Sequence, residues 1–254
     1  MQTGLNIIPV VGLPLVQEGD DIALMICDAV QKMGNPIKEG DILVVAQKIV
    51  SKSEGCTVLL KDVDPSQKAI SLASETDKDP RLVELILRES SEVIRKAPGV
   101  IIVRHRLGII SANAGIDQSN VNHADGEIAL LLPKDPDRSA LGLRKAVARR
   151  TGISAGVIVS DSMNRPWRLG TLGYAIGSAG VLVLDDRRGG TDLFGRELKV
   201  TMTNQADSIA NAAMLVMGET SERIPAALVR GLPVQNSNQV ARDSIRPAAE
   251  DLFL

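Results

Sequence analysis

Two apolar runs that each lead into aspartates most constrain what this chain can fold into. Val157–Val159 precedes Asp161, and Val181–Leu184 precedes Asp185 and Asp186. Runs of β-branched residues of this length predict buried strands. An acid at the end of such a strand is expected at the rim of a sheet, where ligands commonly bind. The pattern therefore predicts a sheet with carboxylates at its edge.

Arginines follow both acidic sites. Arg165 and Arg168 come after the first site, and Arg187 and Arg188 come after the second. Carboxylates are ligands for hard divalent cations, and guanidinium groups bind phosphate. Clusters of aspartate and arginine also form solvated ion pairs on protein surfaces, so the pattern alone leaves both interpretations open.

Composition excludes several classes of protein. The 254 residues suffice for one large domain or two smaller ones, and 44% of them are hydrophobic. A net charge of -2 and an aromatic content of 2% argue against an electrostatic or base-stacking nucleic-acid binder.

The cysteines and histidines do not predict a metal site. Cys27 and Cys56 form no C-x-x-C pair, and His105 and His123 have no zinc-ligand spacing. With no leader sequence and no apolar run of about 18 residues, we expect a cytoplasmic protein without membrane contact.

Periodicity predicts an α+β architecture with two lobes. Strands are expected over 5–11, 42–46, 100–103, 130–133 and 226–229, and helices over 20–33, 80–97, 137–150 and 207–217. The polar segment 60–80 reads as a loop, and the tail 235–254 is expected to pack on the body.

The common nucleotide-binding motifs are missing. The chain has no G-x-x-x-x-G-K-[ST] and no G-x-G-x-x-G after a strand. The evenly spaced glycines Gly170, Gly173, Gly177 and Gly180 fit neither template. They predict a close backbone approach, either to another segment or to a bulky ligand.

The residues best suited to chemistry are carboxylates that could bind a metal ion. Besides the strand-end acids, Asp117 lies in a small-residue loop and Glu219 follows a predicted helix. Such carboxylates suit Mg²⁺ or Mn²⁺ in a site that leaves coordination positions to substrate phosphates. The loop around Asp117 could equally be a turn built on Asx side chains. The residues favour a divalent-metal enzyme that handles phosphate, without distinguishing hydrolysis, transfer and ligation.

Seven segments in order resemble one known family closely. They read GLPLVQEGDDI, VSKSEG, SANAGIDQSN, SDSMNRPWRLGTLGYAIGSAG, DLFGREL, LVMGE and RPAAEDLF. They span nearly the whole chain and resemble the coenzyme F420-0:γ-glutamyl ligase family. The resemblance implies one ligase domain over 1–254 with two intertwined lobes, mixed and antiparallel sheets and flanking helices. It implies neither a P-loop nor a Rossmann fold, and no C-terminal nitroreductase-like domain.

The resemblance also implies an activity. Such a ligase uses GTP to activate the terminal carboxylate of the deazaflavin precursor F420-0 as an acyl phosphate. L-Glutamate then attacks, and GDP and phosphate are released, with further rounds adding γ-linked glutamates. The expected cofactors are two divalent ions per subunit, Mg²⁺ or Mn²⁺, with a monovalent cation such as K⁺ as a further possibility. The expected assembly is a homodimer.

Site residues follow position by position from the resemblance. The metal ligands would be Asp117, Asp161, Ser162 and Glu219. The nucleotide would contact Leu13, Pro14, Leu15, Val16, Gln47, Lys48, Lys52, Asn120, Met217, Gly218, Glu219, Thr220, Ser221, Glu222, Arg223 and Ile224. By charge and position, Arg165, Arg168, Asp186 and Arg187 are candidates for anchoring substrate or phosphate. No general base for the glutamate amine is identified.

The sequence departs from the family pattern at a few positions, and other functions remain possible. Ser162 stands where threonine is also common, and Met163-Asn164 replaces the more usual Phe-Gly in the wall of the deazaflavin pocket. Trp167 is expected either in that pocket or in the core. A family member ligating a different acid or amino acid, a phosphohydrolase with the same metal cluster, and a non-catalytic binding module are the alternatives.

Overall fold

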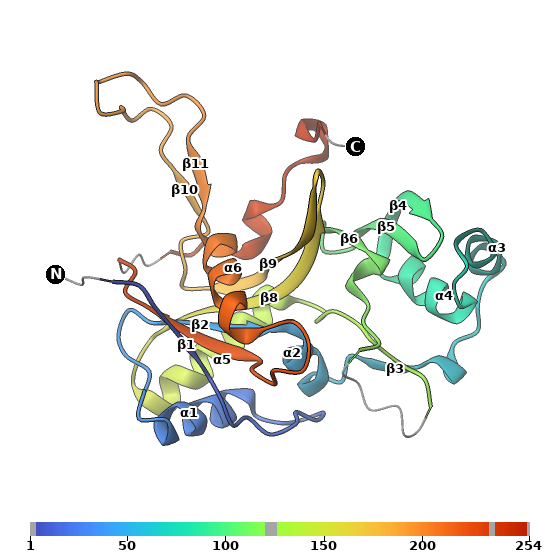
Figure 1. Cartoon of the computed structure of the whole chain (residues 1–254), viewed down its shortest axis with the longest axis horizontal. Coiled ribbons are helices and arrows are strands. Elements are labelled where there is room, and N and C mark those ends of the chain that lie inside the picture. The colour runs from blue at the N-terminus through green and yellow to red at the C-terminus, as the bar shows by residue number, and fades with distance from the viewer. Residues whose placement is uncertain (1–3, 120–125, 234–236, 253–254) are drawn as a thin grey trace.

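A mixed five-stranded sheet forms the centre of the molecule (Figure 1). The computed structural model describes residues 4–119, 126–233 and 237–252. The strand order is β1 (Asn6–Pro9), β12 (Ala226–Arg230), β2 (Ile42–Ala46), β8 (Gly156–Arg165) and β9 (Arg168–Ala179). Only β2 and β8 pair in parallel, and the other neighbours are antiparallel. The mixed α+β class predicted from the sequence is confirmed.

Helices cover both faces of this sheet. On one face lie α1 (Ile22–Lys32) and α5 (Pro136–Thr151), and on the other lies α6 (Gln205–Met217). The alternation of β8 explains this packing, because Val157 and Val159 point to the α1 and α5 side while Ile158 points to α6. The short helix α2 (Gln47–Ser53) follows β2 directly.

A second group of elements lies beside the main sheet, on the right in Figure 1. It contains α3 (Gln67–Thr76), α4 (Pro80–Arg88) and the antiparallel sheet of β4 (Ser90–Ala97), β5 (Val100–His105) and β6 (Ile110–Ala112). Strands β3 (Thr57–Leu59) and β7 (Ile128–Leu130) connect it to the main body. The group has its own apolar clusters, one of which contains Val83, Ile86 and Ile101.

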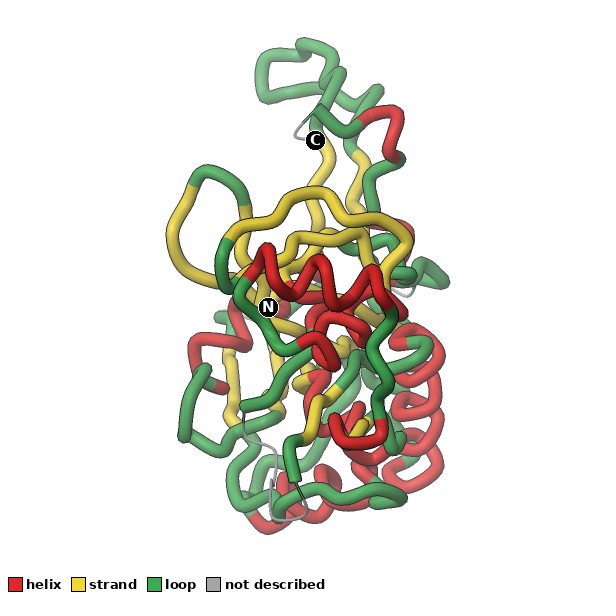
Figure 2. The backbone as a smooth tube through the Cα atoms, turned by 90° about the vertical axis from the view of Figure 1, so that its right-hand side faces the viewer, coloured by secondary structure: helices red, strands yellow, loops and turns green. Residues whose placement is uncertain are grey.

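A projecting arm and a tail complete the chain. The arm begins at the hairpin of β10 (Leu184–Asp186) and β11 (Met202–Asn204) and rises above the body in both views (Figures 1 and 2). The tail contains two 3₁₀ turns, Ala241–Ser244 and Ala248–Glu250. It packs on the body as predicted, because Asp137 accepts a 2.8 Å hydrogen bond from the Ala241 N–H.

Both apolar runs were expected to form strands that end before their acids, but the observed strands include these acids. Asp161 lies within β8, directly opposite Tyr174 of β9, because β9 supplies hydrogen-bond partners well beyond the apolar run. Val181 and Val183 of the second run are buried, yet strand β10 starts only at Leu184 and includes both acids of that site. Hydrogen-bonding partners, and not the extent of the apolar run, set these strand ends.

The predicted helix over 80–97 was wrong in its second half. It ends at Arg88, and Ser90–Ala97 forms β4, in which Val93 pairs with Val103 of β5. The helical spacing of Val93 and Ile94 was accidental, since β-branched residues also suit a strand. The loop expected over 60–80 contains α3, capped by the Ser66 side chain, which accepts from the Ala69 N–H at 3.2 Å.

The other helices were predicted nearly correctly, with small shifts at their caps. Asp21 caps α1 where Asp20 was expected, and Asp135, two residues before Asp137, caps α5. In the described part of the chain, both cysteines are free, and no helix has the length and apolarity needed to cross a bilayer.

The glycines of β9 allow the helices to approach the strand. A Cβ atom at Gly173 would lie 2.7 Å from the Ala210 carbonyl oxygen of α6, and one at Gly177 would lie 2.2 Å from that of Pro136. At these two positions the expected close approach is to other segments of this chain, whereas a Cβ atom at Gly170 would meet nothing within 4 Å.

Candidate functional site

One cavity of about 640 Å³ gathers most of the predicted site residues. It lies among the segment after β1, helix α2, the middle of β8 and the loop after α6. Its lining includes Leu13, Pro14, Leu15, Val16, Gln47, Lys48, Lys52, Asp161, Ser162, Met217, Gly218, Glu219, Thr220, Ser221, Glu222, Arg223 and Ile224. Asn120 lies outside the described residues. We call this space the first cavity.

Helix α2 presents two lysines to the first cavity. Lys48 and Lys52 are one helical turn apart, so their side chains lie on one face of α2. Burial lowers the pKa of Lys52, and the neighbouring Lys48 charge lowers it further. Two partly buried ammonium groups that repel each other favour an anionic ligand between them. Gln47 beneath them is buried and accepts a 2.9 Å hydrogen bond from the Ser51 hydroxyl.

Lys48 also joins α2 to the segment between β6 and β7. Its ammonium group forms an ion pair with Asp117 and lies 3.0 Å from the Ser119 hydroxyl oxygen. Backbone hydrogen bonds with Leu130 hold Asp117 in place. Burial alone would raise the pKa of Asp117, but the hydrogen bonds from Lys48 and Ser119 outweigh it, and the pKa lies below its usual value.

Asp161, Ser162 and Glu219 form the acidic side of the first cavity. The Ser162 hydroxyl donates to Glu219 Oε1 at 2.7 Å, and the Ser162 N–H donates to Asp161 Oδ1 at 2.9 Å. Burial raises the pKa of Asp161 to about 7, and the charges of Asp117 and Glu219 act in the same direction. The Ser162 N–H and the Lys48 charge oppose this rise. Asp117 and Glu219 thus each lie near enough to Asp161 to repel its carboxylate.

The donor chemistry of this acidic side fits a divalent cation. Carboxylate and hydroxyl oxygens are the ligands that hard cations prefer, and a cation there would offset the repulsion among the carboxylates. Asp117, Asp161, Ser162 and Glu219 would hold it. In the described residues, however, no three His, Cys, Asp or Glu side chains are already arranged around a common point that could hold a metal. Lys48 and Ser162 occupy some of the carboxylate oxygens instead.

The loop after α6 is held in shape by its own residues. Gly218 ends α6 with a φ of +73°, and a Cβ atom there would lie 2.3 Å from the Glu222 carboxyl carbon. The Glu222 carboxylate accepts hydrogen bonds from the Thr220 N–H at 2.7 Å and from its hydroxyl at 3.1 Å. These local contacts were not foreseen from the sequence, because they depend on the left-handed conformation at Gly218.

The arginine candidates that follow Asp161 lie at the turn between β8 and β9. Arg165 donates a 3.1 Å hydrogen bond to the Gly170 carbonyl oxygen, and Arg168 is exposed. Trp167, between them, is 85% exposed, so the expectation of a core position was wrong. None of the three lines the first cavity.

The candidates Asp186 and Arg187 lie at the base of the arm. Asp186 accepts hydrogen bonds from Arg188, at 2.6 Å for the shortest, and Arg187 pairs with Asp185 at 2.8 Å. These are the exposed ion pairs that an Asp–Arg cluster commonly forms, and they do not line the first cavity.

A second cavity of about 610 Å³ shares the β8–β9 ribbon with the first, and its lining includes Met163 and Asn164, which the family resemblance places in the wall of a deazaflavin pocket. Its lining comes from β5 and β6, from the β8–β9 ribbon and from the tail, including Arg104, Met163, Tyr174 and Arg246. The rest of its lining was not predicted, because residues so distant in the sequence share no common spacing.

The fold and the two adjoining cavities define the class: an α+β protein with a charged ligand site beside a mixed sheet. The family model described as F420-0:Gamma-glutamyl ligase matches residues 11–231, and the chain belongs to this family. It is 44% identical to the coenzyme F420:L-glutamate ligase of Methanothermobacter thermautotrophicus, over 98% of this chain and 99% of the relative. The proteins of the same name from Methanopyrus kandleri and Methanocaldococcus jannaschii are each 43% identical, over 98% and 95% of this chain and 99% and 94% of theirs.

Proposed function

We propose that this protein ligates L-glutamate to the deazaflavin precursor F420-0, using GTP and an acyl-phosphate intermediate. Membership of the family and the names of its relatives support the ligation. The observation that carries the proposal is the first cavity, in which one side is basic and the other is acidic. A nucleoside triphosphate needs the basic side for its phosphates, and its divalent cations need the acidic side.

The two sides of the first cavity have separate roles in this proposal. Lys48 and Lys52 bind the phosphate groups, because their ammonium groups are partly buried on one face of α2. The apolar residues Leu13, Val16 and Ile224 contact the base of the nucleotide. Divalent cations, held by the acidic side, would neutralise charge on the transferring phosphoryl group.

The proposed reaction has two steps. A carboxylate oxygen of the acceptor attacks the γ-phosphorus of GTP, and the bond to the leaving GDP oxygen breaks. The amine of glutamate then attacks the acyl carbon, phosphate leaves, and the nitrogen loses a proton to form the amide. The protein contributes position and charge to both steps, since Lys48 and Lys52 hold the phosphates near the acceptor.

The test is a single reaction followed by mass spectrometry. The protein is incubated with GTP, L-glutamate, F420-0 and either Mg²⁺ or Mn²⁺. We expect GDP release that requires both glutamate and F420-0, and a product heavier than F420-0 by one or more glutamyl residues. Equal GTP turnover without glutamate would indicate a phosphohydrolase and would overturn the proposal. Incorporation of another amino acid, or of glutamate into another acid, would favour the alternative ligase.

We also propose that the chain forms a homodimer through its arm. Leu193, Phe194 and Val200 on the arm are 98%, 94% and 86% exposed, and so much exposed apolar surface favours burial against another chain. Light scattering after gel filtration tests this. We expect wild type at twice the monomer mass and Phe194→Asp at the monomer mass, whereas an unchanged mass of the variant would exclude the arm as the interface.

A further inference from the structure

We infer that the second cavity binds the acceptor substrate, with its aromatic ring against the apolar wall and its anionic tail on Arg104 and Arg246. This inference rests on the proposed function, because it assigns a place to the substrate that the reaction would extend. It adds a site for that substrate and two binding residues.

The two cavities adjoin along the β8–β9 ribbon. On β8, Ser162 lines the first cavity and the next residue, Met163, lines the second. On β9, Gly173 lines the first and Tyr174 the second. Successive side chains of a strand point to opposite faces, so the β8–β9 ribbon is a wall that the two cavities share.

Asp161 lies at the junction of the cavities. It lines the first cavity, and it pairs directly across the ribbon with Tyr174, which lines the second. Side chains that face each other in an antiparallel pair lie on the same side of the sheet. At this pair the two cavities therefore meet on one face of the ribbon, which places the acidic side of the first cavity beside the second, as transfer of a phosphoryl group between two bound substrates requires.

The charges of the second cavity suit an anion. In the part of the chain that the structure describes, the lining contains five arginines and three aspartates. One of these acids, Asp137, accepts hydrogen bonds from the backbone N–H groups of Ser178 and Ala241, so its charge is used within the protein. The five guanidinium groups of the lining therefore outnumber its two other carboxylates.

Arg104 and Arg246 approach the second cavity from different elements. The Arg104 side chain is only 17% exposed, and its ion pair with Glu92 is long, at 3.4 Å. A guanidinium group that is so little exposed needs strong partners, and an anionic ligand would supply them. Arg246 lies on the tail, which forms one wall of the cavity.

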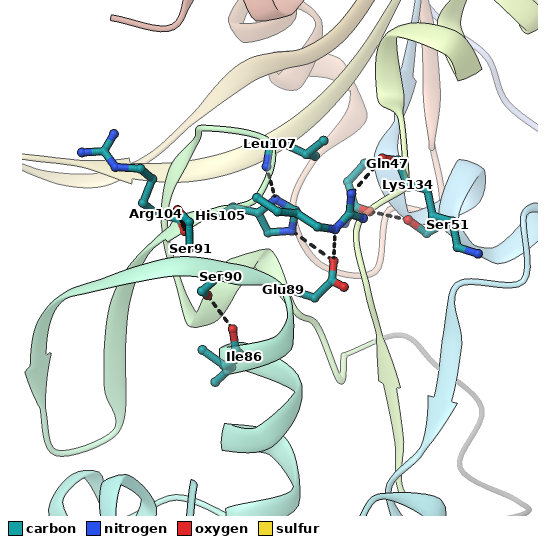
Figure 3. Close-up of polar contacts among 11 residues, drawn as sticks. Gln47, Ser51, Ile86, Glu89, Ser90, Ser91, Arg104, His105, Leu107 and Lys134 are labelled. Carbon is teal, nitrogen blue, oxygen red and sulfur yellow. Dashed lines mark hydrogen bonds and ion pairs between the residues drawn. The ribbon is translucent and has the colours of Figure 1, made fainter. Parts of the chain in front are cut away.

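A buried histidine holds part of the apolar wall. His105 is fully buried, and its Nδ1 accepts a 3.0 Å hydrogen bond from the N–H of Leu107, which lines the second cavity (Figure 3). The ring proton is therefore assigned to Nε2, which lies 3.3 Å from a Glu89 carboxylate oxygen. Arg106 donates to the same carboxylate at 2.9 Å and to the Lys134 carbonyl oxygen at 2.9 Å. His105 is thus a positioning residue for the turn from Leu107 to Ile109.

This wall has the composition of a pocket for a flat ring. Leu107, Ile109, Met163 and Ile176 provide apolar surface, and Tyr174 provides an aromatic face. Small-molecule sites are mostly apolar with a few placed polar groups. A deazaflavin ring with a phosphate and a carboxylate on its tail matches both halves of the cavity.

The experiment measures binding separately from catalysis. Wild type, Arg104→Gln, Arg246→Gln and the exposed control Arg149→Gln are titrated with F420-0 and with a deazaflavin that lacks the anionic tail. The fluorescence of Trp167, the only tryptophan and adjacent to the lining residue Pro166, reports binding. GTP affinity and the thermal midpoint of unfolding are measured on the same samples, and Arg104→Lys provides a conservative variant of the less exposed arginine.

We expect each glutamine variant to weaken F420-0 binding by roughly 10-fold or more, the range for a lost hydrogen bond to a charged group. Binding of the ring without its tail, GTP affinity and the Arg149→Gln control should stay within about twofold, the scatter of a neutral surface change. The inference is overturned if wild type does not bind F420-0, or if both variants bind it as wild type does. If wild type binds F420-0 with the arginine dependence described but forms no glutamyl product, the proposed function fails while the acceptor site stands.

Discussion

The Ser162 hydroxyl donates a 2.7 Å hydrogen bond to Oε1 of Glu219, which lies 57 positions further along the chain. The bond joins the middle of β8 to the loop that follows α6. Next to it, the Ser162 N–H binds Asp161. A strand and a loop are thereby brought together so that three oxygen-bearing side chains face one cavity, which is the arrangement on which the proposed cation site depends.

Removal of this hydroxyl should reduce the ligase activity. Ser162→Ala leaves Glu219 without its donor and removes one oxygen from the proposed cation site. We expect kcat to fall by about 10- to 100-fold, corresponding to about 1.5–3 kcal/mol for a hydrogen bond to a charged group. Ser162→Thr, which keeps the hydroxyl, should retain most of the activity. The rate of GDP release at several Mg²⁺ or Mn²⁺ concentrations checks this, and full activity of the alanine variant would remove Ser162 from the site.

Asp161→Asn should separate activity from stability. The carboxylate is required for the cation in the proposed mechanism, so glutamate ligation should fall to background. Stability should not fall, because burial and the charges of Asp117 and Glu219 already disfavour the ionised carboxylate. We therefore expect the metal-free variant to unfold at the same temperature as wild type or above it. A large drop in the thermal midpoint, or retained activity, would contradict this account of Asp161.

Lys48→Gln should weaken GTP binding and alter the position of Asp117. The variant removes a phosphate-binding charge together with the ion pair to Asp117. We expect the Kd for GTP to rise by about 10-fold or more, from the loss of a charge-assisted hydrogen bond. Lys61, exposed on another element, provides the control Lys61→Gln, for which the Kd should not change. Equal affinity of Lys48→Gln and wild type would assign Lys48 a purely structural role.

The sequence was most informative where local signals and tertiary contacts agree. The central strands were recognisable because Ile42–Ala46 and Ala226–Val229 are short apolar runs bounded by turn residues. Helix α6 was recognisable because its apolar residues recur with helical spacing up to the capping Gly218. The residues of the first cavity were named through family resemblance, and the structure brings those it describes together around one space.

Where the partner of a segment decides its structure, the sequence was less informative. Asp161 looked like a strand end because nothing in β8 itself shows that β9 continues beside it. Val93 and Ile94 fit a helix by spacing, and only the pairing with β5 makes them a strand. Asp185 and Asp186 resembled Asp161 by pattern, yet they pair with arginines at the arm. Only the three-dimensional neighbours distinguish these aspartates.

The missed helix α3 leads to a prediction about pH. Glu84 of α4 accepts hydrogen bonds from the Ser66 hydroxyl at 2.6 Å and from the Ser66 N–H at 3.0 Å, at the residue that caps α3. These bonds, with a smaller contribution from Arg88, lower the pKa of Glu84 from 4.5 to about 2. A carboxylate whose pKa is lowered by folding stabilises the protein above its unfolded pKa, and that contribution disappears as pH falls from about 4.5 towards 2.

Glu84→Gln should therefore destabilise the protein at neutral pH and not in acid. We expect a loss of about 1–2 kcal/mol in the free energy of unfolding at pH 7, below the full value of about 1.4 kcal/mol per pKa unit because water and salt screen the site. The difference from wild type should shrink steadily below about pH 4.5. Glu75→Gln, which breaks only the exposed pair with Lys96, is the control and should change stability by less than about 0.5 kcal/mol. Urea unfolding at a series of pH values measures both variants, and a difference for Glu84→Gln that is independent of pH would show that the charge of Glu84 does not stabilise the start of α3.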